Sequence, residues 1–141
     1  MRNDKIYQRL IRDGYIFIAP EGNSMRPFLT EGKDRVVIKS KKPKKYDVIL
    51  YERAGGDLIL HRVLEISGSK YMVCGDHEVH IEVIDQSTVI GVMSHIERDG
   101  RFKNADNLPY IIWGRLWGVM CIRKVILKTM KRISRILKKR R

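Results

Sequence analysis

The sequence predicts a mainly β domain, a small coiled barrel or sandwich, followed by an amphipathic basic helix. Three observations support this prediction. Short apolar runs alternate with turn residues between positions 15 and 97, apolar residues recur at steps of three and four after position 108, and basic residues gather at the C-terminal end. The length of 141 residues suits one compact domain with a real core.

The charge is unevenly distributed along the chain. Lys and Arg number 29 against 16 Asp and Glu, a net charge of +13, but 11 of the basic residues lie from Arg115 onward, where there is no acidic residue. The first 114 residues carry a net charge of only +2. We therefore expect a nearly neutral domain with a cationic tail, and the tail is the part suited to an anionic partner.

Two segments make up the predicted N-terminal part. Residues 1–14 predict a short helix or arm, because apolar residues recur at helical spacing and Gly14 follows them. Residues 15–97 predict the β-rich domain, in which glycines suit tight hairpin turns. Its strands are expected at 15–19, 35–39, 47–53, 58–66, 70–75 and 88–97.

Residues 98–107 are polar, which predicts a linker, and residues 108–141 predict one amphipathic cationic helix. With Trp113 and Trp117 near its start, this helix resembles those that lie in a membrane interface. We expect it to attach the protein peripherally to an anionic membrane surface. The alternatives are a helix packed on the β domain with a solvated basic face and, less favoured, a helix that binds nucleic acid through phosphates.

Other classes of protein fit the sequence poorly. The most apolar stretches are short or interrupted by Arg115, so no classical transmembrane segment is expected. Charges within the first 13 residues argue against a signal peptide. Cys74 and Cys121 match no disulfide framework, and we predict no cofactor.

Three short motifs contain residues that can perform chemistry. Ser24 lies in the turn-like segment 22–27, Gly-Asn-Ser-Met-Arg-Pro, and a serine hydroxyl becomes a good nucleophile only beside a base. His61 lies within a predicted strand and can accept a proton near neutral pH. Asp76 follows a glycine at a strand end and can orient a histidine. Each also has a purely structural interpretation: a turn, a hydrogen-bonded histidine and a turn-stabilising aspartate.

Together these motifs, in this order and at these separations, resemble the signal peptidase family of membrane-associated serine endopeptidases. The resemblance covers roughly residues 15–96 and rests on the segments 22–27, 46–51, 61–63, 75–76 and 89–92. It implies the coiled, barrel-like β fold that this family shares with self-cleaving repressors. Most bacterial members have a lysine base; the histidine resembles the endoplasmic-reticulum and archaeal branch, which is thought to use serine, histidine and aspartate.

The resemblance implies a role for each of these residues. Ser24 would attack the scissile carbonyl of an extended precursor, and His61 would act first as general base and then as general acid. Asp76 would orient His61, with Asp85 as a second candidate. The backbone N–H of Ser24, aided by the Asn23 side chain, would stabilise the oxyanion. The expected function is an endopeptidase that removes a leader or signal peptide from a precursor.

Other functions stay open from the sequence alone. A non-catalytic or regulatory β domain, with a basic helix that binds a membrane or nucleic acid, fits the same charge pattern. Cleavage within a loop of the same chain is a third possibility. Cys74, His77 and His80 are residue types that bind zinc, but their spacing of three suits a helix better than the loop expected here, so we predict no metal site.

Overall fold

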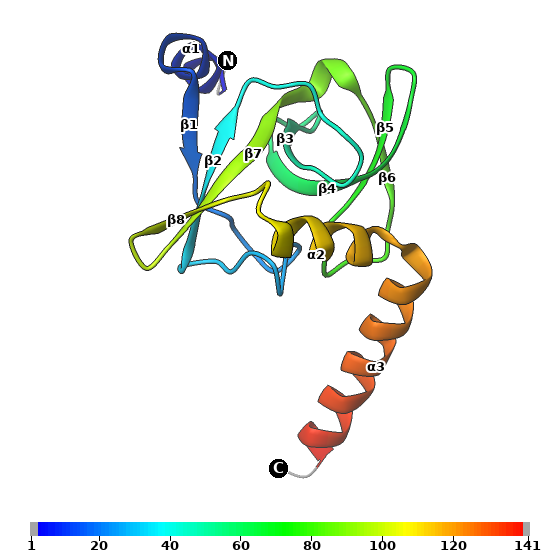
Figure 1. Ribbon diagram of the computed structural model, residues 1–141. Helices are drawn as coiled ribbons and strands as arrows, with labels where there is room; N and C mark the ends of the chain where they lie inside the picture. The colour runs from blue at the N-terminus through cyan, green and yellow to red at the C-terminus, as the bar shows by residue number, and fades with distance from the viewer. Residues whose placement is uncertain (1–2, 140–141) are drawn as a thin grey trace.

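The computed structural model describes residues 3–139, apart from the side chains of residues 120–122. The chain passes through helix α1 (Asp4–Asp13), eight strands, helix α2 (Leu108–Gly118) and helix α3 (Met120–Lys139), as Figure 1 shows. A 3-10 turn, Gln86–Thr88, precedes the seventh strand. The strands are β1 (Tyr15–Ile18), β2 (Asp34–Lys39), β3 (Val48–Glu52), β4 (Leu58–Ser67), β5 (Lys70–Cys74), β6 (Glu82–Asp85), β7 (Val89–Arg98) and β8 (Arg101–Asn104).

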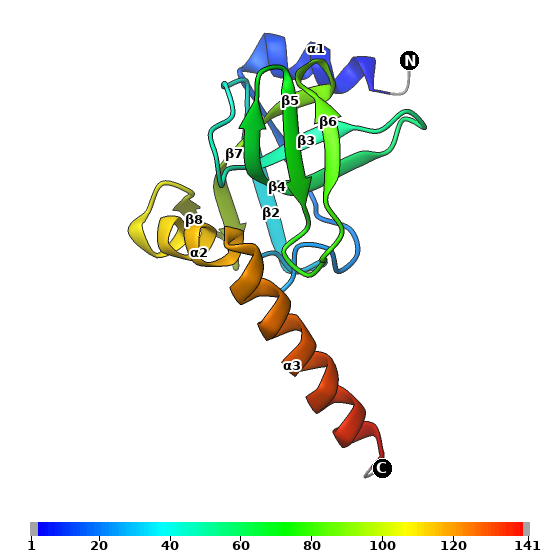
Figure 2. The same cartoon turned by 90° about the vertical axis from the view of Figure 1, so that its right-hand side faces the viewer.

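The strands form one antiparallel sheet in the order β1-β2-β7-β3-β4-β5-β6, with β8 paired to β7. This confirms the mainly β fold. The expected closure into a barrel is not found, because the outer strands β1 and β6 do not pair with each other. The sheet nevertheless curls at β4, which pairs with β3 up to Arg62 and with β5 from Arg62 onward. Figure 2 shows the β5–β6 hairpin after this bend.

The sheet buries apolar residues on both faces of β3. Val48 and Leu50 belong to one cluster with residues of α1, β2 and β7, whereas Ile49 and Tyr51 belong to a second cluster under β4, β5 and β6. Successive side chains of a strand lie on opposite faces, so a strand covered on both sides is apolar throughout. His61, on the neighbouring strand, therefore lies beside the second cluster.

The expected linker at 98–107 contains strand β8. Asp99 and Gly100, with φ angles of +54° and +71°, form the two-residue turn of a β7–β8 hairpin. All four residues of β8 are exposed, so the strand is held by backbone pairing and lacks the apolar alternation from which a strand is usually predicted.

The predicted single helix at 108–141 is two helices that meet at Val119. Helix α2 packs against the β domain through Gly114 and Gly118. A Cβ atom at Gly114 would lie 2.9 Å from Arg62 Nη1, and one at Gly118 would overlap the ring of Tyr46. Glycine at these positions therefore lets α2 approach the sheet closely. Residues 1, 2, 140 and 141 of the predicted arm and tail lie outside the described residues.

Candidate active site

Ser24 lies on the segment between β1 and β2, and the core fixes this segment in place. Gly22 has a φ angle of +74°, which favours glycine. Met25 and Leu29 are buried in the core, and the Leu29 N–H donates a 2.9 Å hydrogen bond to the Met25 carbonyl. The Ser24 carbonyl accepts a 2.8 Å hydrogen bond from the His77 N–H. This bond ties the serine to the chain segment that follows β5.

Ser24 and His61 meet at Gly75. A Cβ atom at Gly75 would lie 3.0 Å from Ser24 Cβ and 3.1 Å from His61 Nε2, and it would overlap the Ser24 carbonyl oxygen. The serine Cβ and the imidazole nitrogen are therefore no farther apart than the sum of these two distances. The structure thus brings together the two residues on which the sequence prediction depends, and it does so at a position where only glycine fits.

His61 is held by a chain of polar groups that the sequence analysis did not identify. Its Nδ1 atom lies 3.1 Å from the Tyr51 hydroxyl, and this hydroxyl donates a 2.8 Å hydrogen bond to Glu82 Oε2. Arg53 in turn donates to both oxygens of Glu82, at 2.7 Å from Nη2 and 3.1 Å from Nε. The imidazole is therefore oriented by a tyrosine and a glutamate.

The direction of these bonds determines which ring nitrogen carries the proton. A tyrosine hydroxyl has one proton, and that of Tyr51 is donated to the Glu82 carboxylate. The hydroxyl oxygen can then only accept from His61, so Nδ1 is the protonated nitrogen. This leaves a lone pair on Nε2, the nitrogen beside Gly75, although within residues 3–139 no hydrogen bond joins it to Ser24. A general base needs this tautomer.

Burial keeps the imidazole neutral. His61 is 3% exposed, and its pKa is lowered to about 4, first by burial and then by the charge of Arg53, with Glu82 acting in the opposite direction. Burial and the hydrogen bond to Glu82 raise the pKa of Tyr51, so its hydroxyl keeps its proton. At neutral pH, His61 is therefore in the form that accepts a proton.

Asp76 makes no hydrogen bond to His61 within residues 3–139, although the resemblance implied that it would orient this histidine. Its carboxylate accepts two 2.8 Å hydrogen bonds from Arg62, and both residues are buried. Arg62 follows His61 in β4, so its side chain lies on the opposite face of the strand. Trp113 Nε1 donates to the same carboxylate, and Trp117 Nε1 donates to the Asp76 carbonyl. Asp76 therefore connects α2 to the sheet.

Asp85 and Asn23 also lie differently from their expected roles. Asp85 is half-buried at the far end of the β5–β6 hairpin, three residues beyond Glu82, or about 10 Å. It pairs with Lys70 and caps the 3-10 turn through Ser87 N–H, and this backbone bond is the main cause of its lowered pKa. The Asn23 side chain is exposed and makes no hydrogen bond within residues 3–139.

Two further side chains lie near the site, Glu78, which the sequence analysis did not identify, and Cys74. Glu78 Oε2 lies 3.6 Å from His61 Nε2, and the Glu78 N–H donates a hydrogen bond to the Gly75 carbonyl. Cys74, part of the weighed zinc motif, donates its thiol proton to the His80 carbonyl, and burial raises its pKa to about 11. Cys74 is thus a buried structural thiol.

A groove of about 660 Å³ opens beside Ser24. One wall is the end of β1 and the chain that follows it, residues 17–22, and the other is the first part of β4, residues 58–60. Within residues 3–139, β1 pairs with β2 alone and this part of β4 with β3 alone, because β5 begins its pairing at Arg62. The groove therefore runs between two backbone edges that have free hydrogen-bonding groups.

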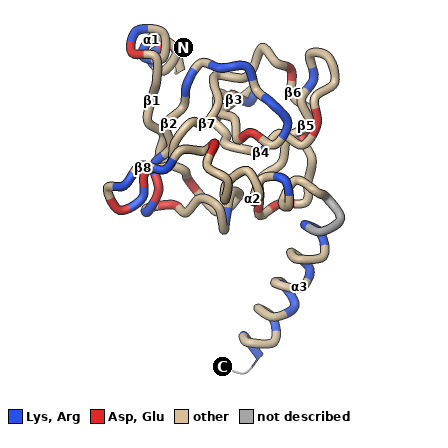
Figure 3. The backbone as a smooth tube through the Cα atoms, viewed as in Figure 1, with Lys and Arg blue, Asp and Glu red and all other residues tan. Residues whose placement is uncertain are grey.

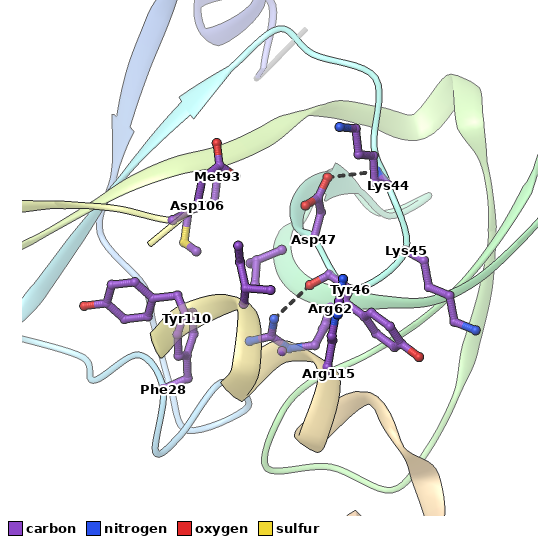
Figure 4. Close-up of a pocket in the computed structure, with 14 residues that line it drawn as sticks. Phe28, Lys44, Lys45, Tyr46, Asp47, Arg62, Met93, Asp106, Tyr110 and Arg115 are labelled. Atoms are coloured by element: carbon purple, nitrogen blue, oxygen red, sulfur yellow. Dashed lines mark hydrogen bonds between the residues drawn. The ribbon is translucent and has the colours of Figure 1, made fainter. Parts of the chain in front are cut away.

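A second cavity, of about 490 Å³, lies on the other side of β4 under α2 (Figure 4). Arg62 lines it and donates a 2.8 Å hydrogen bond to the Tyr46 carbonyl, and Asp47 accepts one from the Lys44 N–H. Neither Ser24 nor His61 lines this cavity. It belongs to the docking of α2 and not to the serine site.

The contrasting surroundings of the two aspartates lead to a stability prediction. We expect Asp76→Asn to lower the free energy of unfolding by about 3 to 5 kcal/mol, because it leaves the buried Arg62 charge without its partner. Asp85→Asn, the matched control, breaks an exposed pair and should change stability little. Chemical denaturation of the two variants measures this. Equal stabilities would contradict the structural role assigned to Asp76.

We compared the chain with known proteins, and no family model, no curated protein and no solved structure matches it.

Proposed function

We propose that this protein is a serine endopeptidase similar to signal peptidases, with Ser24 as nucleophile and His61 as general base. The observation that carries the proposal is the placement of His61. Its Nδ1 is paired with Tyr51, and its unprotonated Nε2 faces Gly75 and the serine. The curled antiparallel sheet also supports the finer proposal that the fold is the one shared by signal peptidases and self-cleaving repressors.

The proposed reaction uses only groups of this chain, the substrate and water. Ser24 Oγ attacks the scissile carbonyl while His61 Nε2 takes its proton, which forms a tetrahedral intermediate. His61 then gives the proton to the leaving amine, and the peptide bond breaks to leave an ester on Ser24. Water, activated by the same nitrogen, hydrolyses this ester and releases the carboxylate product. Tyr51 and Glu82 stabilise the transient imidazolium.

The backbone N–H of Ser24 is the proposed donor to the oxyanion. Within residues 3–139 it donates no hydrogen bond, so it is available to the substrate. Each donor of this kind lowers the barrier by about 3 kcal/mol. A rotation of the exposed Asn23 side chain toward the substrate would supply a second donor, as the sequence analysis expected.

The groove beside Ser24 supports an extended peptide as substrate. A peptide laid along it can pair its backbone with the free edges of residues 58–60 and of the chain after β1. Recognition by backbone pairing suits a leader or signal peptide, because such segments are extended at the site of cleavage. The proposed substrate is therefore a precursor protein or peptide.

Covalent labelling tests the nucleophile. A fluorophosphonate should attach one group per chain at Ser24, and the protein should cleave a leader peptide that ends in small residues. Ser24→Ala should abolish both, whereas Ser67→Ala, a change at an exposed serine at the end of β4, should alter neither. Labelling that persists in Ser24→Ala would refute the proposal and leave a non-catalytic β domain as the alternative.

The rate of labelling should depend on pH through His61. Protonated imidazole cannot accept the serine proton, so the rate falls as the pH decreases, and the half-maximal value should lie near pH 4 because burial lowers the pKa of His61. A rate profile with circular dichroism at each pH separates this effect from unfolding. A midpoint at or above the ordinary histidine value of about 6.5 would contradict the assignment of a buried neutral base.

Removal of the Tyr51 hydroxyl tests the orienting chain. Tyr51→Phe should lower kcat by about a hundredfold, because His61 Nδ1 loses its partner and the base loses its fixed tautomer. Tyr71→Phe removes a hydroxyl from another buried tyrosine of the same apolar cluster and should leave kcat nearly unchanged. If both variants cleave at the wild-type rate, Tyr51 has no part in catalysis.

A further inference from the structure

The C-terminal helices expose apolar residues that no part of the described chain covers. On α3 these are Val125, Met130, Ile133, Ile136 and Leu137, each between 41% and 64% exposed. Helix α3 projects away from the β domain toward its C-terminal end, as both views show (Figures 1 and 2). Helices in proteins are stabilised mainly by packing of their apolar face. An uncovered face on this helix therefore indicates a missing partner.

Helical geometry divides α3 into three faces. With 3.6 residues per turn, the five exposed apolar residues lie on one side of the axis. The opposite side carries the cations that Figure 3 shows along the helix, Lys124, Lys128, Lys131, Arg132, Arg135 and Lys138. Between the two faces lie Arg123 and Leu127, which are 0% and 2% exposed.

The narrow third face is the one that α3 uses to contact the rest of the protein. Arg123 and Leu127 lie one turn apart near the start of the helix, and both are buried. The exposed apolar residues of α3 therefore lie outside its docked face. Helix α2 packs on the β domain, as the packing alternative expected, whereas the exposed apolar residues of α3 stay uncovered within the described part of the chain.

Helix α2 has a similar division of faces. Trp117 is buried, and Trp113 stacks on it with ring centroids 4.7 Å apart, so these rings pack on the domain and do not form the membrane-interface pair that the sequence suggested. The outer face instead exposes aliphatic side chains, Leu108, Ile111, Ile112 and Leu116. Both C-terminal helices therefore carry exposed apolar side chains.

The charge pattern determines which partner fits this surface. The chain has no acidic residue after position 108, so two copies joined through their apolar faces would bring like charges together. A nucleic acid would pair with the cations but would leave the aliphatic face in water. An anionic lipid surface satisfies both faces at once, because acyl chains cover the apolar side and headgroups attract the flanking cations.

We propose that α2 and α3 form a docking surface for an anionic membrane, with α3 lying in the plane of the interface. No helix within residues 3–139 is long and apolar enough to cross a bilayer. The proposal does not depend on the peptidase assignment, and Ser24→Ala should bind vesicles as the wild type does.

Vesicle flotation with the full chain tests the proposal. The wild type should float with vesicles of phosphatidylglycerol and phosphatidylcholine, and binding should weaken with salt and on pure phosphatidylcholine. Ile133→Gln with Leu137→Gln keeps the charge and should lower the affinity about a hundredfold, because two aliphatic side chains no longer enter the acyl region. Since both positions are exposed, the variant should unfold at the wild-type temperature.

A charge variant separates the electrostatic contribution to membrane binding from the contribution of the apolar face. Lys131→Gln with Lys138→Gln keeps the apolar face and should lower the affinity for anionic vesicles about thirtyfold at low salt. Failure of the wild type to float would overturn the proposal. The proposal would also be overturned if the Ile133 and Leu137 variant bound vesicles as tightly as the wild type. It would be overturned as well if the wild type formed a dimer without lipid and this variant were monomeric, since a second copy would then be the partner.

Discussion

The hydrogen bond between His61 Nδ1 and the Tyr51 hydroxyl is the interaction on which the site depends. A histidine that is 3% exposed loses the solvation of its charged form, and its Nδ1–H still needs a partner within the protein. Tyr51 accepts this bond because its own proton is donated to Glu82. Burial and orientation together therefore favour a neutral imidazole whose Nε2, beside Gly75, carries the free lone pair.

The two faces of β4 have different tasks. His61 lies on the face that meets Gly75 and the serine, whereas Arg62, the next residue, lies on the other face and pairs with Asp76. Because neighbouring side chains of a strand lie on opposite faces, a single strand can separate an ionic docking contact from the proposed proton-transfer site. Asp76 also accepts hydrogen bonds from both tryptophans of α2, so this helix is anchored on the face of β4 opposite His61.

The sequence indicated Ser24 and His61 as candidates through the order and separation of their motifs, and the structure places both beside Gly75. Tyr51 was harder to find, since its role depends on register: β3 and β4 place Ile49 opposite His61, which makes Tyr51 a diagonal neighbour. Glu82 reaches the site only through the β5–β6 pairing of Val73 with Glu82. Asp76, which follows Gly75, was expected to orient His61, but its carboxylate pairs with Arg62. Strand β8 was not predicted, because its exposed, mostly polar residues show no alternation of apolar and polar positions.

The most direct test of this account is the protonation state of the His61 ring, measured by nitrogen NMR on the folded protein at neutral pH. The account predicts a proton on Nδ1 and none on Nε2, with this pattern lost in the variant that lacks the Tyr51 hydroxyl. A proton on Nε2, or a doubly protonated ring, would contradict it, because His61 could not then accept the serine proton.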